Sequence, residues 1–175
     1  LYVSDKPVNN NINLYVLGFD SNKRLQILNN SVKANIKKFL QGYKLLTDRV
    51  NILDAFRVSI GINYSITVYR GYNSYEVLAK CSDSLAKYFE IDKWEINQPI
   101  VIDDVLIEIA KIDGVQTVNN IEIVNKYQQR DGGDYAPYTY NIEENTRDNV
   151  VYPSADPCIF ELRYPQNDIV GTARQ

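Results

Sequence analysis

The chain contains 175 residues, of which 45% are hydrophobic, and its formal net charge is −3. This length suits one domain, and the apolar content excludes wholesale disorder. The slight acidic excess predicts no nucleic-acid partner, because proteins that bind nucleic acid usually carry a surplus of lysine and arginine. No apolar run approaches the roughly 18 residues that span a bilayer, so we also predict no membrane partner.

The residue types missing from the chain narrow its chemistry. Histidine is absent, which removes the commonest general base and the commonest metal ligand. The only cysteines, Cys81 and Cys158, are predicted to be free thiols and are too few for a structural zinc site. Methionine is also absent, including at position 1, which we interpret as the mark of a fragment or mature product of a longer chain.

The first third of the chain predicts a strand, a helix and a short strand. Residues 1–11 are polar and are interpreted as a connector from an upstream part, and residues 12–19 are an apolar strand expected inside a sheet. A helix capped by Asn30 or Ser31 follows, and residues 50–53 form the next strand. The apolar stripe of this helix repeats with a period of 3.6 residues and consists of Val32, Ile36, Phe39, Leu40 and Tyr43.

The clearest pattern lies in residues 57–69. Every even-numbered residue from Val58 to Val68 is apolar, whereas the odd-numbered residues between them are polar or glycine. This alternation predicts a long strand with one buried face and one face in water, with Gly61 as a candidate bend or bulge.

A second helix is predicted after Asn73, which precedes Glu76 by three residues as in a capping box. Its apolar stripe contains Val77, Leu78, Cys81, Leu85, Tyr88 and Phe89. Residues 91–100 are then predicted to form a strand anchored by Trp94 and Ile96.

A third, short helix is predicted with Asp103 as its cap and Gly114 at its end. Its inward residues are expected to be Val105, Leu106, Ile109 and Ile112. The last core strand should contain Val118, Ile121 and Ile123 and continue to about Tyr127.

These elements predict an α+β fold. Residues 12–53 and residues 57–100 both contain a β-α-β unit, and this repeat favours a ferredoxin-like, split β-α-β domain with helices on one face of a mixed sheet. The core domain should span residues 12–128. We expect the buried face of the strand at 57–69 to pack against the first two helices.

Composition changes after Gln129, and residues 129–175 are predicted to form an extended arm rich in aromatic residues and proline. Four of the six prolines lie there, and only residues 159–164 resemble a strand. Ordering such an arm costs more conformational entropy than its aromatic side chains return, so it should dock on its own domain or on a neighbour. Because interfaces are enriched in tyrosine, the interface candidates are Tyr135, Tyr138, Tyr140, Tyr152, Phe160 and Tyr164.

The sequence assigns no catalytic, cofactor-binding or metal-binding residue, and we do not expect an enzyme. No lysine-serine or lysine-threonine pair follows Gly132-Gly133, so the pair is not a phosphate loop. Asp131 and Asp134 could contact a cation, but two carboxylates fall well short of the oxygen ligands that calcium takes. Asp103 and Asp104 fit the start of a helix better than a catalytic pair.

Four runs of residues carry a resemblance to a known family. They are residues 40–56 (LQGYKLLTDRVNILDAF), 92–100 (DKWEINQPI), 114–118 (GVQTV) and 151–161 (VYPSADPCIFE). Together they resemble the T4-type baseplate wedge proteins of contractile-tailed bacteriophages, within the broader baseplate J-like group. The chain is similar to the C-terminal part of these longer subunits, and it departs from them at Cys158, where a small polar residue is expected.

The resemblance implies a structural role in the virion tail baseplate, after assembly in the host cytoplasm. Such subunits form the inner ring around the tail hub, so a homodimer or ring self-association and contacts with other wedge proteins are expected. The family has no catalytic residues and no cofactor to transfer. The alternative is a small-ligand-binding regulatory module of ferredoxin-like type, which would not need the aromatic arm.

Overall fold

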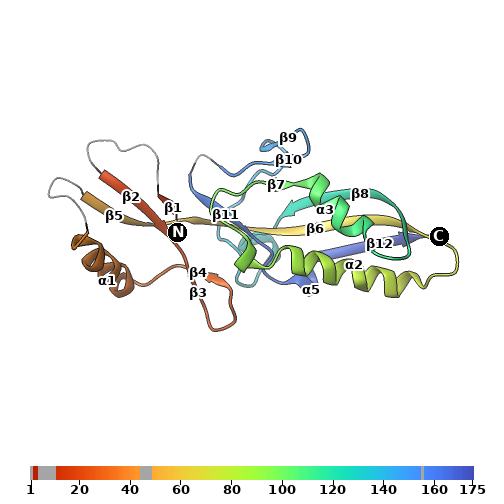
Figure 1. Ribbon diagram of the computed structural model, residues 1–175, viewed down its shortest axis with the longest axis horizontal. Coiled ribbons are helices and arrows are strands. Elements are labelled where there is room, and N and C mark those ends of the chain that lie inside the picture. The colour runs from red at the N-terminus through yellow and green to blue at the C-terminus, as the bar shows by residue number, and fades with distance from the viewer. Residues whose placement is uncertain (1, 4–10, 44–48, 155) are drawn as a thin grey trace.

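The computed structural model describes residues 2–3, 11–43, 49–154 and 156–175 and has a mixed α+β fold. The molecule is elongated, with a small lobe at one end and a larger body at the other (Figure 1). The small lobe contains the strands β1 (Tyr2–Val3), β2 (Asn11–Val16) and β5 (Arg49–Asp54), in the order β1-β2-β5. The predicted strand at 50–53 is thus confirmed, whereas the one at 12–19 is confirmed only as far as Val16, because Gly18 and Phe19 belong to a separate hairpin.

The helix α1 (Asn30–Gln41) connects β2 to β5 and packs against β5. Because β2 and β5 are parallel, their connection must cross over, and α1 provides that crossover. Its N-cap is Asn29, whose Oδ1 accepts a hydrogen bond of 2.8 Å from the amide of Val32. The predicted caps Asn30 and Ser31 are therefore wrong by one and two positions.

A small hairpin precedes α1 and reaches from the lobe toward the body. It consists of β3 (Gly18–Phe19) and β4 (Leu25–Gln26). The carboxylate of Asp20 holds the turn by accepting hydrogen bonds from the amides of Asn22 and Arg24, at 2.8 and 2.9 Å.

The long predicted strand is confirmed as β6 (Phe56–Val68) and is the centre of the main sheet. The antiparallel strand β8 (Val115–Asn125) and the parallel strand β12 (Ile169–Arg174) both pair with residues 62–67 of β6, so they occupy its opposite edges. A fourth strand, β11 (Cys158–Glu161), runs parallel to residues 56–59 of β6. The sheet is mixed, as predicted.

Gly61 serves a close approach between segments. The register shifts of the β6–β8 pair lie at Ser65/Ile66 and Thr67/Val68, so the predicted bend or bulge at Gly61 is wrong. A side chain at Gly61 would begin 2.8 Å from Cε of Lys126 and 3.1 Å from the carbonyl oxygen of Asp168. The absence of a side chain thus lets the end of β8 and the start of β12 close around β6.

The helices α2 (Ser74–Tyr88) and α3 (Ile102–Ala110) pack against each other, α2 against β12 and α3 against β8. All even-numbered residues of β6 from Val58 to Val68 are buried, and α2 buries Val77, Cys81 and Leu85 in the same core. Asn73 caps α2 as predicted, accepting a hydrogen bond of 3.0 Å from the amide of Tyr75. The stripe of the second helix and the buried face of β6 are confirmed. The predicted face in water is not, because Ser59 and Gly61 are buried and the other odd-numbered residues from Arg57 to Thr67 are half-buried.

The predicted contact between the first helix and this core is wrong. No residue of α1 is buried, and Phe39 is 67% exposed. The physical reason is connectivity, because α1 is the crossover of the lobe sheet and rests on β5. Its apolar stripe is only half covered by that narrow sheet, which leaves Val32, Phe39 and Tyr43 at the surface.

The predicted strand at residues 91–100 is also wrong. A 3-10 helix occupies Ile91–Lys93, Asn97 adopts a positive φ of 67°, and only β7 (Ile100–Val101) is extended. The apolar residues that suggested a strand anchor a loop on α2. Trp94 is buried there, stacks on Phe89 at 5.1 Å and donates its indole N–H to the carbonyl oxygen of Tyr88 at 3.2 Å.

Two details of the third helix differ from the prediction. Its N-cap is Val101, and the carboxylate of Asp103 instead accepts a hydrogen bond of 3.2 Å from the side chain of Asn149. Leu106, predicted inward, is 38% exposed because Val105 and Ile109 face the core. Gly114 has the expected positive φ, 98°, but it closes the turn before β8.

The segment predicted as an extended arm contributes strands to the sheets. It contains β9 (Thr146–Arg147), β10 (Val150–Val151), β11, α5 (Pro165–Asp168) and β12. The short helix α4 (Gln128–Asp131) begins one residue before this segment and lies mostly within it. The strand at 159–164 is confirmed in part as β11, whereas β12 was missed. In β12, Gly171 lies directly against the ring of Tyr64 of β6, which leaves no room for a side chain. This packing explains why a strand contains glycine, a residue that weakens the sequence pattern of a strand. The described strands show no clear ferredoxin-like repeat.

Candidate assembly interface

Four of the predicted interface residues form contacts within the chain that account for much of their surface. Phe160 is buried, and the ring of Tyr140 meets it edge-on at 5.8 Å. Tyr135 is buried as well and packs edge-on against Tyr164 at 5.3 Å. The aromatic residues of 129–175 therefore dock largely on their own chain.

The other two candidates are more open. Tyr138 is partly exposed, and its hydroxyl accepts a hydrogen bond of 3.0 Å from the amide of Arg57. Tyr152 is exposed, and its carbonyl oxygen accepts the hydroxyl hydrogen of Tyr140. Burial raises the pKa of Tyr140 to about 12, so its hydroxyl stays protonated and serves as a donor at neutral pH. Tyr138 and Tyr152 remain the members of this set with surface available to a partner.

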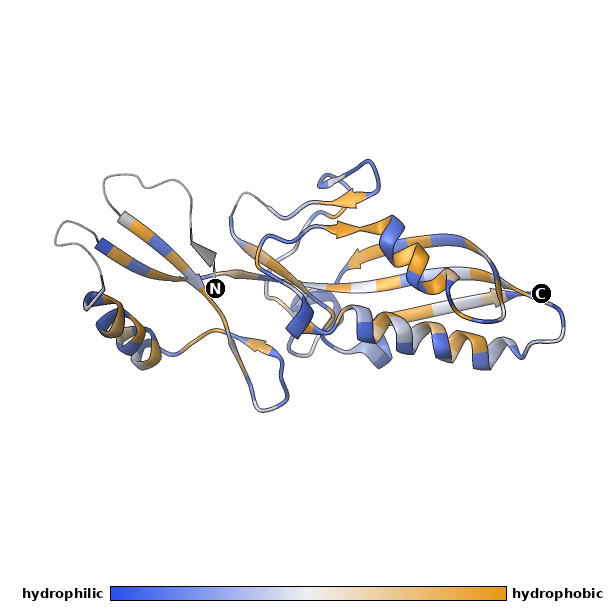
Figure 2. Cartoon of the chain, viewed as in Figure 1, coloured by the Kyte–Doolittle hydropathy of each residue, from blue (hydrophilic) through white to orange (hydrophobic). Residues whose placement is uncertain are grey.

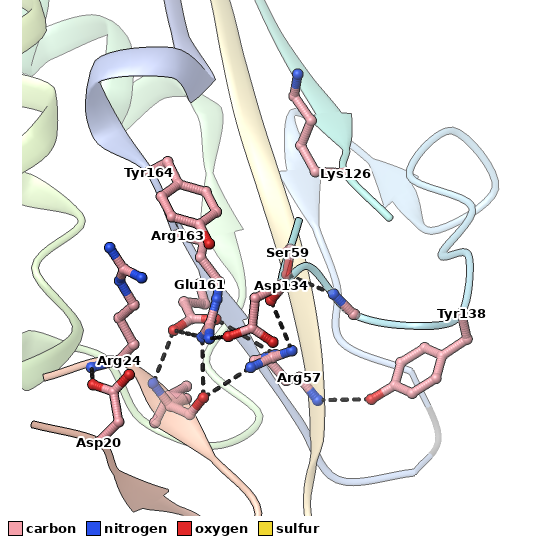
Figure 3. Close-up of polar contacts among 12 residues, drawn as sticks. Asp20, Arg24, Arg57, Ser59, Lys126, Asp134, Tyr138, Glu161, Arg163 and Tyr164 are labelled. Atoms are coloured by element: carbon pink, nitrogen blue, oxygen red, sulfur yellow. Dashed lines mark hydrogen bonds and ion pairs between the residues drawn. The ribbon is translucent and has the colours of Figure 1, made fainter. Parts of the chain in front are cut away.

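A buried cluster of charged side chains joins the β3–β4 hairpin to the main sheet (Figure 3). Arg163 lies within 3.1 Å of both carboxylate oxygens of Glu161, and both side chains are almost fully buried. Arg163 also pairs with Asp134, and Arg57 lies 3.6 Å from Glu161. Each buried charge thus has an opposite charge beside it, which such burial requires.

The charged cluster is hydrogen-bonded to the backbone of Leu25 in the hairpin. Its amide donates to Glu161 at 2.9 Å, and its carbonyl oxygen accepts from Arg57 at 2.8 Å and from Arg163 at 3.0 Å. Burial alone would lower the pKa of Arg163, but the adjacent Glu161 and Asp134 carboxylates raise it above its usual value. Arg163 therefore keeps its charge, and the hydrogen bonds of the cluster fix the hairpin against β11.

No metal-binding cluster emerges from the part of the chain that the structure describes. In this part, no group of three or more histidine, cysteine or acidic residues could hold a metal ion. Asp131 accepts hydrogen bonds from Arg130 and from the amide of Tyr127, while Asp134 pairs with Arg163. Cys81 and Cys158 are free and buried, and burial raises the pKa of the Cys81 thiol to about 11. Over the same described residues, every helix is too short or too polar to cross a membrane.

Large apolar side chains are exposed on several elements, and among the described residues Tyr75 of α2 is the most exposed at 85%; the helices α1 and α3 each carry two such side chains. On α1, Phe39 is 67% exposed, and Val32 and the following Tyr43 are exposed beside it. On α3, Leu106 and Ile107 are 38% and 48% exposed. Figure 2 shows apolar and polar residues mixed along both helices, which lie in different parts of the molecule. Exposed apolar surface of this kind marks interaction sites.

Sequence reasoning treated the apolar stripes of both helices as core. It named the lysine-bearing face of the first helix only as an alternative assembly surface, on the basis of the three lysines that α1 contains. The charge cluster was missed as well, because Glu161 and Arg163 lie in a segment that the pattern marked only as strand-like.

Comparisons with known proteins do not identify the chain. A search found no matching protein-family model. A search of curated proteins likewise found no significant match.

Proposed function

We propose that this chain is a structural subunit of the baseplate wedge of a contractile-tailed bacteriophage. In this role it forms part of the inner ring around the tail hub, by self-association and by contacts with other wedge proteins. It acts in the tail baseplate of the virion, after assembly in the host cytoplasm, and it performs no enzymatic reaction. The resemblance of the four runs described above supports this kind of assembly.

The observation that carries the proposal is the uncovered helix of the small lobe. A surface helix normally buries its apolar stripe, because that burial provides most of its stability. In α1 no residue is buried and Phe39 is mostly exposed. A partner protein that covers this stripe would complete the lobe, and a wedge subunit has such partners.

The placement of the resembling runs also supports the proposal. Asn97, from the run at 92–100, donates its amide to the carbonyl oxygen of Cys158 at 2.7 Å. Phe56, from the run at 40–56, donates its amide to the carbonyl oxygen of Pro157 at 2.8 Å. Three runs that are distant in sequence therefore meet where the lobe joins the body.

Sedimentation velocity of the purified chain over a wide concentration range tests the proposal. We expect a reversible increase in mass with concentration, because ring subunits carry self-complementary or head-to-tail surfaces. A chain that stays monomeric at every concentration would overturn the self-association part of the proposal. Contacts with other wedge proteins are tested by mixing the chain with those subunits and measuring co-sedimentation.

The alternative function is a ferredoxin-like, small-ligand-binding regulatory module. It predicts a monomer whose melting temperature rises with a specific metabolite, because a ligand that binds only the folded state stabilises it. A thermal-shift screen with nucleotides and amino acids distinguishes the two functions. A clear shift in a monomeric chain would favour the alternative.

A further inference from the structure

We propose that α1 of one copy docks against α3 of a second copy, head to tail. This inference rests on the proposed ring-forming role and deepens it by naming the two surfaces that meet. The argument comes from the charges, the exposed apolar side chains and the positions of the two helices.

One surface is the basic, apolar face of α1. The helix carries Lys33, Lys37 and Lys38 and no acidic residue. Lys33 is neutralised by Asp54 at 2.7 Å, whereas neither Lys37 nor Lys38 forms an ion pair within the described part of the chain. At 3.6 residues per turn, Lys38 lies on the exposed side of α1 next to Phe39 and Val32, whereas Lys37 lies on the flank nearly opposite Phe39. Lys38 therefore provides the positive charge beside the exposed apolar side chains.

The other surface is the acidic, apolar face of α3. This helix carries Asp103, Asp104 and Glu108 and no basic residue of its own. Glu108 is neutralised by Lys111 at 2.6 Å, but Asp103 is contacted by the neutral side chain of Asn149, and Asp104 has no ion pair among the described residues. Leu106 and Ile107 are exposed beside these carboxylates.

The two faces match in charge and in apolar character. Lys38 opposes Asp103 and Asp104, and Phe39 offers an aromatic anchor to Leu106 and Ile107, while Lys37 adds positive charge at the edge of the contact. Complementary charges of this kind increase the association rate and select the partner, while the buried apolar side chains provide most of the affinity.

The two helices lie far apart in the molecule. Figure 1 shows α1 in the small lobe at one end and α3 over the main sheet in the larger body. They share no contact within the chain, so the match can form only between copies. A contact between different surfaces of two copies is heterologous and continues into a ring or a filament.

The size of the contact sets its expected strength. A single helix-on-helix contact is smaller than the roughly 1,200–2,000 Å² of a standard stable interface. Each contact is therefore weak, and ring closure strengthens it because the last contact forms intramolecularly. Self-association of the isolated chain should accordingly depend on concentration and weaken with salt.

The test uses two charge-reversal variants of the full chain, one for each helix. Lys37→Glu with Lys38→Glu changes α1, and Asp103→Lys with Asp104→Lys changes α3. In sedimentation velocity, each variant alone should associate at least about tenfold more weakly than the unchanged chain, since a tenfold change corresponds to the loss of one modest interaction. A 1:1 mixture of the α1 variant and the α3 variant contains one original Lys–Asp pair of faces and one charge-swapped Glu–Lys pair, and both pairs are complementary. The mixture should therefore regain the concentration-dependent association that each variant alone has lost.

Two controls isolate the effect of the faces. Lys80→Glu with Lys87→Glu makes the same charge change on exposed positions of α2 and should leave association unchanged. Because lysine at a helix start opposes the helix dipole, circular dichroism establishes that the α3 variant is folded, and Asp103→Asn with Asp104→Asn provides a milder second variant.

The outcomes separate this contact from the ring-forming role. If the unchanged chain associates and both charge-reversal variants associate equally well, the α1–α3 contact is wrong while self-association stands. If mixing the two variants does not restore association, the head-to-tail arrangement is wrong. If the unchanged chain itself stays monomeric, both the contact and the self-association fail.

Discussion

The hydroxyl of Tyr135 donates a hydrogen bond of 2.6 Å to the carboxylate of Asp168 inside the protein. The other oxygen of Asp168 accepts the amide hydrogen of Tyr164 at 2.8 Å, and the residue is only 1% exposed. This carboxylate connects the segment after β8 to the short helix that leads into β12. Burial raises the pKa of Asp168, and burial together with the bond to Asp168 raises the pKa of Tyr135.

The first prediction concerns the pH dependence of this contact. A raised folded pKa means that the folded protein holds the Asp168 proton more tightly than the unfolded chain does. The contribution of Asp168 to stability is therefore greatest at acid pH and falls as pH rises from about 3.9 through the folded pKa. Tyr135→Phe removes a bond to the ionised form, so at pH 7 it should lower the free energy of unfolding by about 1.5–3 kcal/mol.

Urea unfolding of the Tyr135→Phe variant at several pH values checks this prediction. The loss should shrink in acid, where Asp168 is protonated in the variant and in the unchanged chain alike. Tyr164→Phe is the control, because it removes a neighbouring hydroxyl without touching Asp168. A loss that is the same at pH 4 and pH 7 would contradict the role given to the carboxylate.

The second prediction concerns the charge cluster that holds Leu25. Arg163→Met removes the main counter-charge of Glu161 and leaves a buried carboxylate with Arg57 at 3.6 Å. Breaking a buried pair in this way should lower the free energy of unfolding by about 3–5 kcal/mol. Urea unfolding monitored by the fluorescence of Trp94 measures the change.

Arg24→Met is the matched control for the cluster. Arg24 lies 4.6 Å over the ring of Tyr164, and its side chain makes no ion pair within the described residues. It should change the free energy of unfolding by about 1 kcal/mol or less. Equal losses in the two variants would show that the buried ion pair has no special importance.

The third prediction concerns the core of the main sheet. Ile62 is fully buried, and its replacement by aspartate would bury an unpaired charge beside α2. Ile62→Asp should therefore prevent folding. Ser65→Asp places the same side chain on the opposite face of β6, where Asn63, Ser65 and Thr67 are only partly covered, and should leave the chain folded. Circular dichroism of the two variants tests the expectation, and a folded Ile62→Asp chain would refute it.

The sequence predicts best where a single physical pattern decides the structure. The alternation of β6 and the stripe of α2 could be predicted because each element buries one face against the other. The environment of α1 could not be predicted, because the same apolar stripe fits a helix in the core and a helix that binds a partner protein. Which of the two occurs depends on connectivity, and the parallel pairing of β2 with β5 is not visible in the local pattern.

Long-range pairing also explains the other errors. The strand β12 has a glycine, Gly171, where the ring of Tyr64 leaves no room for a side chain, and this contact joins residues more than 100 positions apart in the sequence. The site was predictable in part, because tyrosine enrichment pointed to packing in residues 129–175. Whether those rings pack on their own chain or on another is decided by the arrangement of β11 and β12, and composition does not contain that information.

The last prediction concerns truncation after Gln129. This change removes β11 and β12, which are both parallel neighbours of β6, together with the buried Phe160 and the Glu161–Arg163 pair. It exposes one edge of the central strand along most of its length. The core cannot compensate for that loss, because a whole domain is stable by only about 5–15 kcal/mol. We expect the shortened chain to lack a cooperative unfolding transition in circular dichroism and urea titration.

A truncation after Ala173 is the matched control, since it removes only the exposed Arg174 and Gln175 and should remain folded. A peptide of residues 130–175, added to the shortened chain, should restore the transition if these strands act by pairing with β6. A shortened chain that unfolds as cooperatively as the full one would show that residues 130–175 are dispensable for the core. In that case the aromatic side chains of this segment would be free for partners, and the exposed Tyr138 and Tyr152 would be the first positions to test at the interface.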